Sequence, residues 1–280
     1  MEKNLKPRPF KLGTTSFIYP GHIIPNVRQI GAFFDEIELL VFESLPDEVL
    51  PSKSDVRVLA ELGQDLDLSY NVHLPTDVSL TCDSRVERQK GADVQKKVVE
   101  RFDLLSPFTF TLHLDMDRNL SGPEPVKAWK AQARQGLELW VPGLGDPSRV
   151  SVETLWYSPD LFFPLVREFG LGVCADAGHH FKYGYDLAHT FERFKDAITI
   201  VHLHGVDFSG KNPKDHVGLD RLPKEMLDQA MTLVEFFQGT LCLEVFNLNN
   251  LTASLATLSR YFKDIPLPRT IPGSLDKQQP

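Results

Sequence analysis

The sequence has few cysteines and lacks a long apolar run. Its three cysteines, Cys82, Cys174 and Cys242, are odd in number and widely spaced along the 280 residues. This pattern excludes a disulfide framework and favours reduced, mostly buried thiols in the cytoplasm. No apolar stretch approaches the roughly 18–20 residues that a membrane-spanning helix needs. The opening residues MEKNLKPRPF also lack the apolar segment of a secretory signal, so we expect a cytoplasmic protein with no membrane partner.

The sequence also has no excess of positive charge. Lys and Arg number 30 against 38 Asp and Glu, which gives a formal net charge of -8. An acidic chain is poorly suited to gripping phosphate groups over a broad surface, so we expect no nucleic-acid partner. The remaining composition, 42% hydrophobic and 24% charged, is typical of a globular protein and excludes disordered and fibrous classes. A chain of this length can bury a large core without disulfides or a structural metal.

Short strand-like segments alternate with longer helix-like segments through the whole chain. The first are apolar and rich in β-branched residues, as expected for parallel strands covered by helices. They span 11–17, 37–43, 68–74, 108–114, 149–155, 171–177, 198–204 and 241–246, and helical patterns follow near 22–34, 53–66, 86–105, 124–138, 159–169, 185–196, 222–238 and 249–263. A doubly wound sheet also alternates in this way, but eight repeats favour a (β/α)8 TIM barrel. We expect one α/β barrel domain over 11–264, with residues 1–10 and the Pro-rich residues 265–280 as poorly fixed terminal extensions.

Polar side chains gather where the predicted strands end. In a TIM barrel the carboxyl ends of the strands form the active-site face, whereas side chains lower down fill the interior. The expected strand ends carry, in chain order, Glu43, His73, His113, Asp115, Glu153, Asp176, His179, His202, His204 and Glu244. Residues two apart on a strand share a face, so His113 and Asp115 can point together, as can His202 and His204. Imidazole and carboxylate groups are ordinary ligands of divalent metal ions, so this face is the predicted metal site.

The candidate ligands are too many for one ion. A single histidine at a strand end is more often a hydrogen-bonded residue than a ligand. Carboxylates are different, because burying an unpaired carboxylate in an apolar barrel costs several kcal/mol. Glu153, Asp176 and Glu244 each interrupt an apolar strand, and a nearby cation would compensate their charge. We therefore expect two or three divalent ions, Zn, Mn, Co or Fe, with a bridging carboxylate.

The segments between the strands hold weaker candidates. Residues 214–223 (KDHVGLDRLP) show no helix or strand pattern, and we interpret them as part of the loop after the seventh strand, from which His216 leans over the site. His180 is expected to point away from the site into a structural role. The GTTS segment at 13–16 offers donors for a phosphate, although four small residues are a weak signal. Trp156, just past the fifth strand, is expected to pack, and stacking on a planar ligand is the alternative.

Taken together, these residues resemble a known family. Over about 11–246 the pattern is similar to that of the AP endonuclease 2 / xylose isomerase-like TIM barrels. It consists of the histidines that end the third and fourth strands, Glu153, the Asp-x-x-His of Asp176 and His179, His202 and Glu244. Within that span, the strings LGTTSFIYPGHIIPNVR (12–28), IELLVFES (37–44), YNVHLPTD (70–77) and DHVGLDRLP (215–223) resemble the CbiR family of cobamide-remodelling phosphodiesterases. The resemblance implies hydrolysis in the nucleotide loop of a cobamide, a B12-type cofactor, which releases a cobinamide phosphate.

The resemblance also implies roles for individual residues. One ion would be held by His73, His113 and Glu153, and a second by Glu153, Asp176, His202 and Glu244. A third would use His179 with an Asp-x-His pair, but Lys214 stands where that aspartate is expected, which puts the third ion in doubt. The predicted catalytic residues are Glu153, which bridges the ions, and Glu244, which helps to orient the attacking water. The predicted substrate-binding residues are Tyr19, Glu43, Asp115, His204, Asp215 and His216.

The expected substrate carries a large flat corrinoid ring that cannot enter a packed barrel. This ring must rest on the loops above the strand ends, where specificity in this fold resides. The candidates are Phe17, Ile18 and Tyr19, then residues 75–78, and the loop 205–221, each of which supplies apolar or aromatic area. The alternative for these aromatic residues is that they only cap the barrel.

Two other functions remain open from the sequence. A sugar isomerase or epimerase of the same barrel family needs one divalent ion and two carboxylates across the substrate, and Glu153 and Glu244 could serve. That chemistry does not need His73 and His113, which favours the phosphodiesterase. A non-catalytic metal- or cobamide-binding protein is the other alternative, and it would show no turnover. DNA repair fits poorly with the negative net charge and rests on fold analogy alone.

Overall fold

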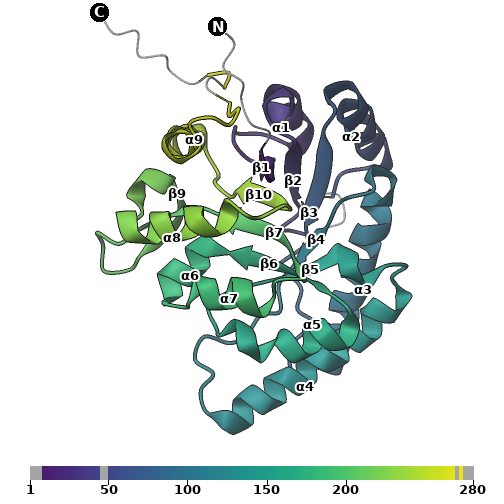
Figure 1. The fold of residues 1–280 in the computed structure, drawn as a ribbon. Helices are drawn as coiled ribbons and strands as arrows, with labels where there is room; N and C mark the ends of the chain where they lie inside the picture. Colours follow the sequence, from purple (N-terminus) through teal and green to yellow (C-terminus); the bar gives the residue numbers. More distant parts are fainter. Residues whose placement is uncertain (1–7, 45–49, 269–270, 274–280) are drawn as a thin grey trace, which may run out of the picture.

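The protein folds as a closed barrel of eight parallel strands surrounded by helices (Figure 1). The structure is a computed structural model that describes residues 8–44, 50–268 and 271–273. The barrel strands are β1 (Lys11–Thr15), β2 (Glu36–Leu40), β3 (Ser69–His73), β4 (Phe110–Leu112), β5 (Val150–Glu153), β6 (Gly172–Asp176), β7 (Ile198–Leu203) and β10 (Thr240–Leu243). Their order around the barrel is β1-β10-β7-β6-β5-β4-β3-β2, so β10 closes the barrel onto β1. The predicted (β/α)8 TIM barrel is confirmed.

Helices follow the strands and cover the outside of the barrel. They are α1 (Ile23–Ile30), α2 (Lys53–Leu66), α3 (Arg85–Phe102), α4 (Pro123–Trp140), α5 (Phe163–Phe169), α6 (Ala177–Tyr183), α7 (Leu187–Arg193), α8 (Lys224–Val234) and α9 (Leu248–Tyr261). Side chains fix where several of them begin. Ser52 and Asp55 form a capping box at the start of α2, and the Asn247 side chain accepts from the Asn250 N–H at 2.9 Å at the start of α9.

Helix α6 is an element that the sequence pattern did not predict. One helix was expected in this region, over 185–196, whereas the structure has α6 and then α7. At seven residues, α6 is too short to show a helical periodicity in the sequence. Its start is fixed by the Asp176 side chain, which accepts a hydrogen bond from the backbone N–H of His179 at 2.7 Å. This cap ties the end of β6 to the first turn of α6.

A short antiparallel hairpin lies between β7 and α8 in the chain and packs against α6. Its strands are β8 (Gly205–Asp207) and β9 (Lys214–Val217), which pair with each other. The interpretation of residues 214–223 as a segment without a strand is therefore wrong for Lys214–Val217. Strands of three and four residues are too short for a clear alternation of polar and apolar residues. The backbone passes closely here, because a Cβ at Gly205 would lie 2.0 Å from the carbonyl oxygen of Gly218.

The hydrophobic core lies mainly between the strands and the helices. Leu39, Val72 and Val152 of the strands belong to one apolar cluster with helix residues such as Leu59 and Leu137. The inner face of the barrel differs, since it combines a small separate cluster of Cys174, Ile200 and Cys242 with buried polar groups. Those polar groups are Glu36, Glu38, Asn71, Thr111, Ser151 and His202. All three cysteines are free; Cys174 and Cys242 are buried, as expected, and Cys82 is half-buried.

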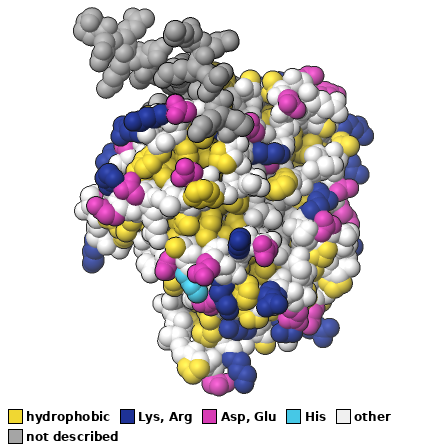
Figure 2. Space-filling view, in the orientation of Figure 1, with side chains coloured by type: hydrophobic (Ala, Val, Ile, Leu, Met, Phe, Trp, Pro, Cys, Tyr) yellow, Lys and Arg dark blue, Asp and Glu magenta, His cyan; other side chains and the backbone are white. Residues whose placement is uncertain are grey.

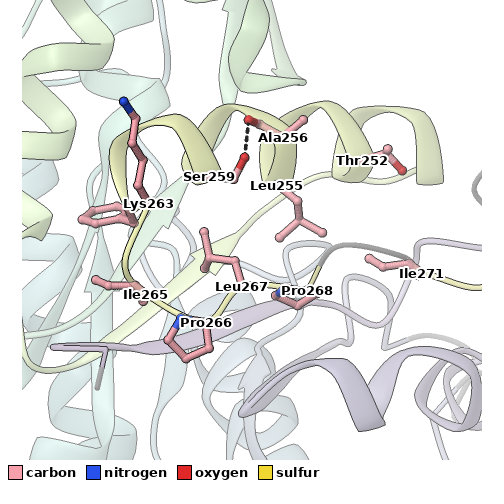
Figure 3. A pocket seen from close by; sticks show the side chains of 11 residues that line it. Thr252, Leu255, Ala256, Ser259, Lys263, Ile265, Pro266, Leu267, Pro268 and Ile271 are labelled. Atoms are coloured by element: carbon pink, nitrogen blue, oxygen red, sulfur yellow. Dashed lines mark hydrogen bonds between the residues drawn. The ribbon is translucent and has the colours of Figure 1, made fainter. Parts of the chain in front are cut away.

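The residues after α9 pack along the barrel. Ile271 is buried, and the carbonyl oxygen of Pro272 accepts a hydrogen bond from the Tyr19 hydroxyl. A cavity of about 560 Å³ lies between α9 and the residues that follow it (Figure 3). The terminal segments were expected to be poorly fixed, but Phe10 and Ile271 of the described residues belong to the core, because both side chains complete its apolar contacts. The domain limits at residues 11 and 264 stay a prediction.

Charged side chains of both signs cover the surface. Figure 2 shows Lys and Arg interspersed with Asp and Glu over one face, with hydrophobic side chains gathered toward its middle. In the part of the chain that the structure describes, no helix is both long and apolar enough to span a membrane.

Candidate metal centre

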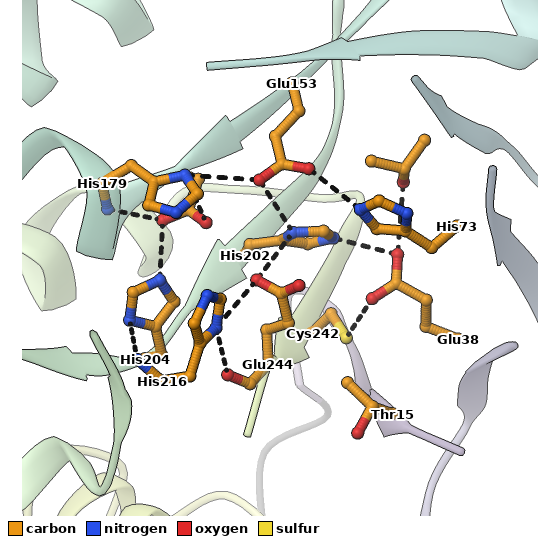
Figure 4. A network of polar contacts seen from close by, with 12 residues as sticks. Thr15, Glu38, His73, Glu153, His179, His202, His204, His216, Cys242 and Glu244 are labelled. Atoms are coloured by element: carbon orange, nitrogen blue, oxygen red, sulfur yellow. Dashed lines mark hydrogen bonds and ion pairs between the residues drawn. The ribbon is translucent and has the colours of Figure 1, made fainter. Parts of the chain in front are cut away.

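The carboxyl ends of the barrel strands bring imidazoles and carboxylates into one connected cluster (Figure 4). The cluster contains Glu38 of β2, His73 of β3, His113 after β4, Glu153 of β5, Asp176 of β6, His179 of α6, His202 of β7, His204 after β7, His216 of β9 and Glu244 after β10. All predicted metal ligands are in this set. Most of these side chains are fully buried, whereas His113, His179 and His216 keep some exposed surface.

Glu153 lies at the centre of the cluster. Its Oε2 atom is 2.9 Å from Nε2 of His113 and 3.2 Å from Nε2 of His73, while its Oε1 atom is 3.4 Å from Nδ1 of His179. Burial alone would raise the pKa of Glu153, but the imidazoles of His113, His179 and His202 outweigh burial and hold that pKa well below its usual range. Glu153 is therefore an ionised carboxylate whose two oxygens face different groups of histidines.

Glu244 occupies a second position of the same kind. Its Oε2 atom is 3.2 Å from Nδ1 of His202 and 3.5 Å from Nδ1 of His216. Burial would raise the pKa of Glu244, but His202 and His216 lower it below its usual range. Together with Asp176 and Glu153, these contacts surround Nδ1 of His202 with carboxylates.

Three histidines form a further group beside Asp176. The rings of His204 and His216 lie 4.2 Å apart, and His179 is within 5.7 Å of both by ring centroids. Burial would lower the pKa of His179, but Asp176 and then Glu153 raise it to about 10. Asp215 forms an ion pair with Lys182 at 2.5 Å and lies 3.9 Å from Nε2 of His179. Lys214, which stands where the sequence pattern expects an aspartate, is exposed.

The donor set fits divalent metal ions. The polar atoms Asp176 Oδ2, His202 Nδ1, His204 Nε2 and Glu244 Oε2 are buried and have no hydrogen-bond partner. Such atoms are costly unless something satisfies them, and a cation would satisfy all four. The ligand atoms of His73, His113 and Glu153 lie within 4.8 Å of one another, as do those of Glu153, Asp176, His202 and Glu244, and those of His179, His204 and His216. The first two groups are the two predicted ligand sets, and they share Glu153.

The predicted substrate-binding residues divide into two kinds. Asp115, Asp215 and His216 lie beside the cluster with partly exposed side chains, at 34%, 26% and 22% respectively. Burial raises the pKa of Asp115, whereas the neighbouring His113 lowers it in part. His204 is completely buried, with Nε2 at 3.2 Å from Oδ1 of Asp176. The side chain therefore has no exposed surface with which to contact a substrate.

Tyr19 and Glu43 are not among the grouped ligands, although Glu43 lies in the wall of a cavity at the ends of β1 and β2. The Tyr19 hydroxyl binds Pro272 of the chain terminus, so this side chain points toward that terminus. Glu43 was expected to close the second strand, but β2 ends at Leu40 and the Glu43 side chain is exposed. Glu38 takes the expected place instead, because it is on the inner face of β2 and fully buried. The signal for Glu38 was the same as for Glu153, a carboxylate that interrupts an apolar strand.

Two other expectations concern residues beside the site. His180 is buried and structural, as expected, with Nδ1 at 2.7 Å from the carbonyl oxygen of Asp176. The GTTS hydroxyls are used inside the barrel, since Thr14 and Thr15 donate to the carbonyl oxygens of Leu243 and Val245 at 3.0 and 2.8 Å. These side chains are therefore not free to hold a phosphate.

An apolar cavity adjoins the ligand cluster. It has a volume of about 800 Å³ and lies at the ends of β1 and β2, with Phe17, Phe42, Phe246, Ile24 and Leu50 in its wall. Phe42 packs its ring edge against His73 at 4.8 Å, and Phe246 lies 4.8 Å from His216. The cavity therefore shares its wall with two of the metal-ligand groups.

Cationic and aromatic side chains lie together on another part of the same rim. The Arg118 guanidinium lies 4.7 Å above the Trp156 ring and 5.9 Å from the Tyr183 ring. Lys182 is 5.3 Å from the same Tyr183 ring, which is 6.1 Å from His179. Trp156 thus stacks on an arginine side chain.

Comparison with known proteins agrees with this fold. The model of the xylose isomerase-like TIM barrel family matches residues 24–265, whereas no curated protein sequence matches the chain significantly. Similar solved structures include a D-tagatose 3-epimerase-like protein (18% identity over 90% of this chain and 97% of that one, TM-score 0.74) and endonuclease IV from Thermus thermophilus (17%, 91% and 99%, TM-score 0.64). Another is an IOLI protein with a binding zinc atom (13%, 91% and 94%, TM-score 0.65). Because the family model matches most of the chain, the protein belongs to the xylose isomerase-like TIM barrel family.

Proposed function

We propose that the protein is a divalent-metal-dependent phosphodiesterase that hydrolyses the nucleotide loop of a cobamide. The observation that carries the proposal is the pair of ligand groups that share Glu153. An enzyme that uses one ion has no need of His73 and His113, yet both are held within 3.2 Å of Glu153. When bound, a pair of divalent ions polarises phosphoryl oxygens and lowers the pKa of water.

The residues of the chain have distinct tasks in this proposal. His73, His113 and Glu153 would hold one ion, and Glu153, Asp176, His202 and Glu244 the other. The Glu244 carboxylate is ionised, and its Oε2 atom is buried without a hydrogen-bond partner. It can accept a hydrogen bond from the attacking water and orient it toward phosphorus. Asp115 and His216, with partly exposed side chains at the edge of the cluster, would contact the substrate.

The rim of the barrel supports a substrate that is both large and anionic. The 800 Å³ cavity offers the aromatic area that a planar organic group needs. Arg118 and Lys182 lie on another part of the rim and can attract a phosphate in an otherwise acidic protein. A cobamide combines these features, with a flat macrocycle and base on either side of one phosphodiester. The resemblance of four sequence strings to the CbiR family supports the same substrate.

The test is hydrolysis of a cobamide by metal-loaded protein, followed by chromatography of the corrinoid products. We expect a cobinamide phosphate from the wild type, and a loss of several orders of magnitude in turnover for Glu153→Gln and Glu244→Gln. His189→Gln is the matched control, because His189 is an exposed histidine on α7 outside the cluster. No cleavage of any cobamide by protein that holds two ions would contradict the proposal.

A sugar epimerase is the second candidate. It is favoured by the similarity to the D-tagatose 3-epimerase-like structure, at a TM-score of 0.74. Glu153 and Glu244 lie in one ligand group with Asp176 and His202, so they could act as acid and base across a ketose bound to one ion. His113→Gln separates the two functions: it should abolish phosphodiester hydrolysis but leave an epimerase active. Conversion of ketoses by this variant would establish the epimerase.

A further inference from the structure

Glu38 is a buried carboxylate that the proposed reaction does not use. It lies on the inner face of β2 and has no exposed surface. Its Oε1 atom lies 3.0 Å from Nε2 of His202 and accepts a hydrogen bond from the Thr111 hydroxyl at 3.2 Å. Its Oε2 atom accepts from the Cys242 thiol at 3.5 Å. Figure 4 shows Glu38 on the opposite side of the His202 ring from Glu153 and Glu244.

The His202 ring lies between Glu38 on one side and Glu153 and Glu244 on the other. Its Nε2 atom faces Glu38, and its Nδ1 atom faces Glu244 at 3.2 Å and Glu153 at 3.8 Å. The Nδ1 atom is buried and has no hydrogen-bond partner. A neutral imidazole carries its proton on one nitrogen and can ligate a metal only through the other. Which nitrogen holds the proton thus decides whether His202 can be a ligand.

We propose that Glu38 is a positioning residue that keeps the proton of His202 on Nε2, so that the lone pair of Nδ1 points into the ligand cluster. The Thr111 hydroxyl and the Cys242 thiol donate to the two oxygens of Glu38, so Glu38 acts as an acceptor, and the opposite tautomer of His202 would place two acceptors face to face. A carboxylate behind a ligating histidine also makes the imidazole a stronger donor to the metal. The inference rests on the metal site of the proposed function, but not on the phosphodiesterase reaction.

His73 provides a comparison inside the same cluster. Its Nδ1 atom lies 3.0 Å from the carbonyl oxygen of Leu74, which leaves Nε2 to face Glu153. A neutral backbone carbonyl holds the His73 ring, whereas an anionic side chain holds the His202 ring. The two metal positions should therefore depend differently on Glu38: the group of Glu153, Asp176, His202 and Glu244 strongly, and the group of His73, His113 and Glu153 weakly.

The first experiment measures the tautomer directly in the wild-type protein. Nitrogen-15 NMR of histidine side chains distinguishes a proton on Nε2 from one on Nδ1, on folded protein that is stripped of metal by a chelator and kept at a pH high enough for the His202 ring to be neutral. The His202 resonances are assigned by their loss in His202→Gln. We expect the neutral His202 ring to carry its proton on Nε2 in the wild type. A proton on Nδ1 would overturn the inference, and this result needs no Glu38 variant to fold.

The second experiment measures metal binding without any substrate. Isothermal titration of stripped protein with Zn²⁺ compares the wild type with Glu38→Gln, which keeps the shape of the side chain but removes its charge. In Glu38→Gln we expect the Zn²⁺ affinity of the group of Glu153, Asp176, His202 and Glu244 to fall by about 10–100-fold, the usual effect of losing such a partner. Glu36→Gln is the matched control, because Glu36 is buried two residues earlier on the same face and bonds Asn71 and Ser69. The control should bind both ions as the wild type does.

These outcomes separate the inference from the proposed function. Equal affinities for Glu38→Gln and Glu36→Gln would overturn the role of Glu38. A wild type that binds Zn²⁺ in a Glu38-dependent way but cleaves no phosphodiester would overturn the proposed function and leave the inference standing.

Discussion

At the scale of single residues, buried carboxylates of the same barrel differ in protonation because their neighbours differ. Imidazoles surround Glu153 and Glu244 and hold the pKa of each carboxyl below its usual range. Glu36 lies deeper, on β2, where burial raises its pKa to about 7, and Lys11 and neutral hydrogen-bond donors only partly offset this. The carboxylates of Glu153 and Glu244 can thus bind cations at neutral pH, whereas Glu36 is partly protonated.

Glu36 should make the stability of the protein depend on pH. Between pH 4.5 and about 7 the folded protein keeps a proton on Glu36 that the unfolded chain releases, so stability falls as the pH rises through this window. Glu36→Gln removes this loss of stability with rising pH, so the variant should be more stable than the wild type at neutral pH by about 1–3 kcal/mol. Urea unfolding of both proteins at the two ends of this pH window measures the difference in stability. Glu43→Gln, an exposed neighbour, should change stability little, and a wild type whose stability rose through this window would contradict the assignment.

Glu153 should control the metal content of the protein. Its carboxylate is common to two ligand groups, so Glu153→Gln should release both ions where loss of His113 releases one. Elemental analysis after gentle purification is the measurement, with His189→Gln as the control. A wild type with one ion or fewer, or a Glu153→Gln variant that keeps two, would be incompatible with a bridging role.

Sequence reasoning found most of the cluster but misplaced one residue. His73, Glu153, Asp176 and Glu244 were predictable because each polar side chain ends an apolar strand. Glu38 was missed because the second strand was expected to run to residue 43, which made Glu43 the strand end. To choose Glu38 over Glu43 one must know where β2 ends, and no local sequence pattern marks Leu40 as its last residue.

At the scale of elements, the connections after β6 and β7 bring the third group of histidines together. Helix α6 carries His179, and the β8–β9 hairpin carries His216. The eight barrel strands were predictable because each contains a run of apolar residues, whereas α6, β8 and β9 are too short for periodicity to reveal them. Their positions follow from tertiary contacts that the sequence does not display.

Gly178 allows α6 to lie against His204. A Cβ at residue 178 would lie 2.0 Å from Cε1 of the buried His204 ring. Gly178→Ala should therefore displace the ring or the helix, and overpacking of this kind costs about 1–3 kcal/mol. Thermal unfolding and Zn²⁺ titration are the measurements. Gly145→Ala is the control, because open space surrounds that position; equal behaviour of the two variants would mean that α6 can move freely.

At the scale of the whole molecule, the site has a chemically divided rim. Aromatic side chains line the cavity at the ends of β1 and β2, whereas Arg118 and Lys182 lie near Tyr183, at the C-terminal end of α6. The barrel could be predicted because eight strands close it, but the division of the rim depends on loops that no pattern describes. Of the loop residues expected to hold the substrate, Phe17 lines the cavity and Tyr19 binds the chain terminus.

Phe17 should affect binding of a large substrate more than the chemistry. Its ring is 50% exposed in the cavity wall, and it does not belong to the ligand cluster. Phe17→Ala should raise KM for a cobamide about tenfold with little change in kcat, because the lost contact is equally strong in substrate and transition state. Hydrolysis of a small aryl phosphodiester should be unaffected, as should both reactions in Phe236→Ala, a more exposed phenylalanine elsewhere. Equal losses on both substrates would place Phe17 in support of the metal site.

The two thiols on the inner face of the barrel can report how often the barrel opens. Cys174 and Cys242 have no exposed surface, and burial raises the pKa of each thiol well above its usual range. An alkylating reagent can modify them only when neighbouring strands separate, because it needs both access and a thiolate. The rate at which Cys174 and Cys242 are labelled therefore reports how often the strands of the barrel separate. Half-buried Cys82 is the internal reference, because a reagent can reach it without such opening. A metal ion bound at the strand ends should lower this labelling rate.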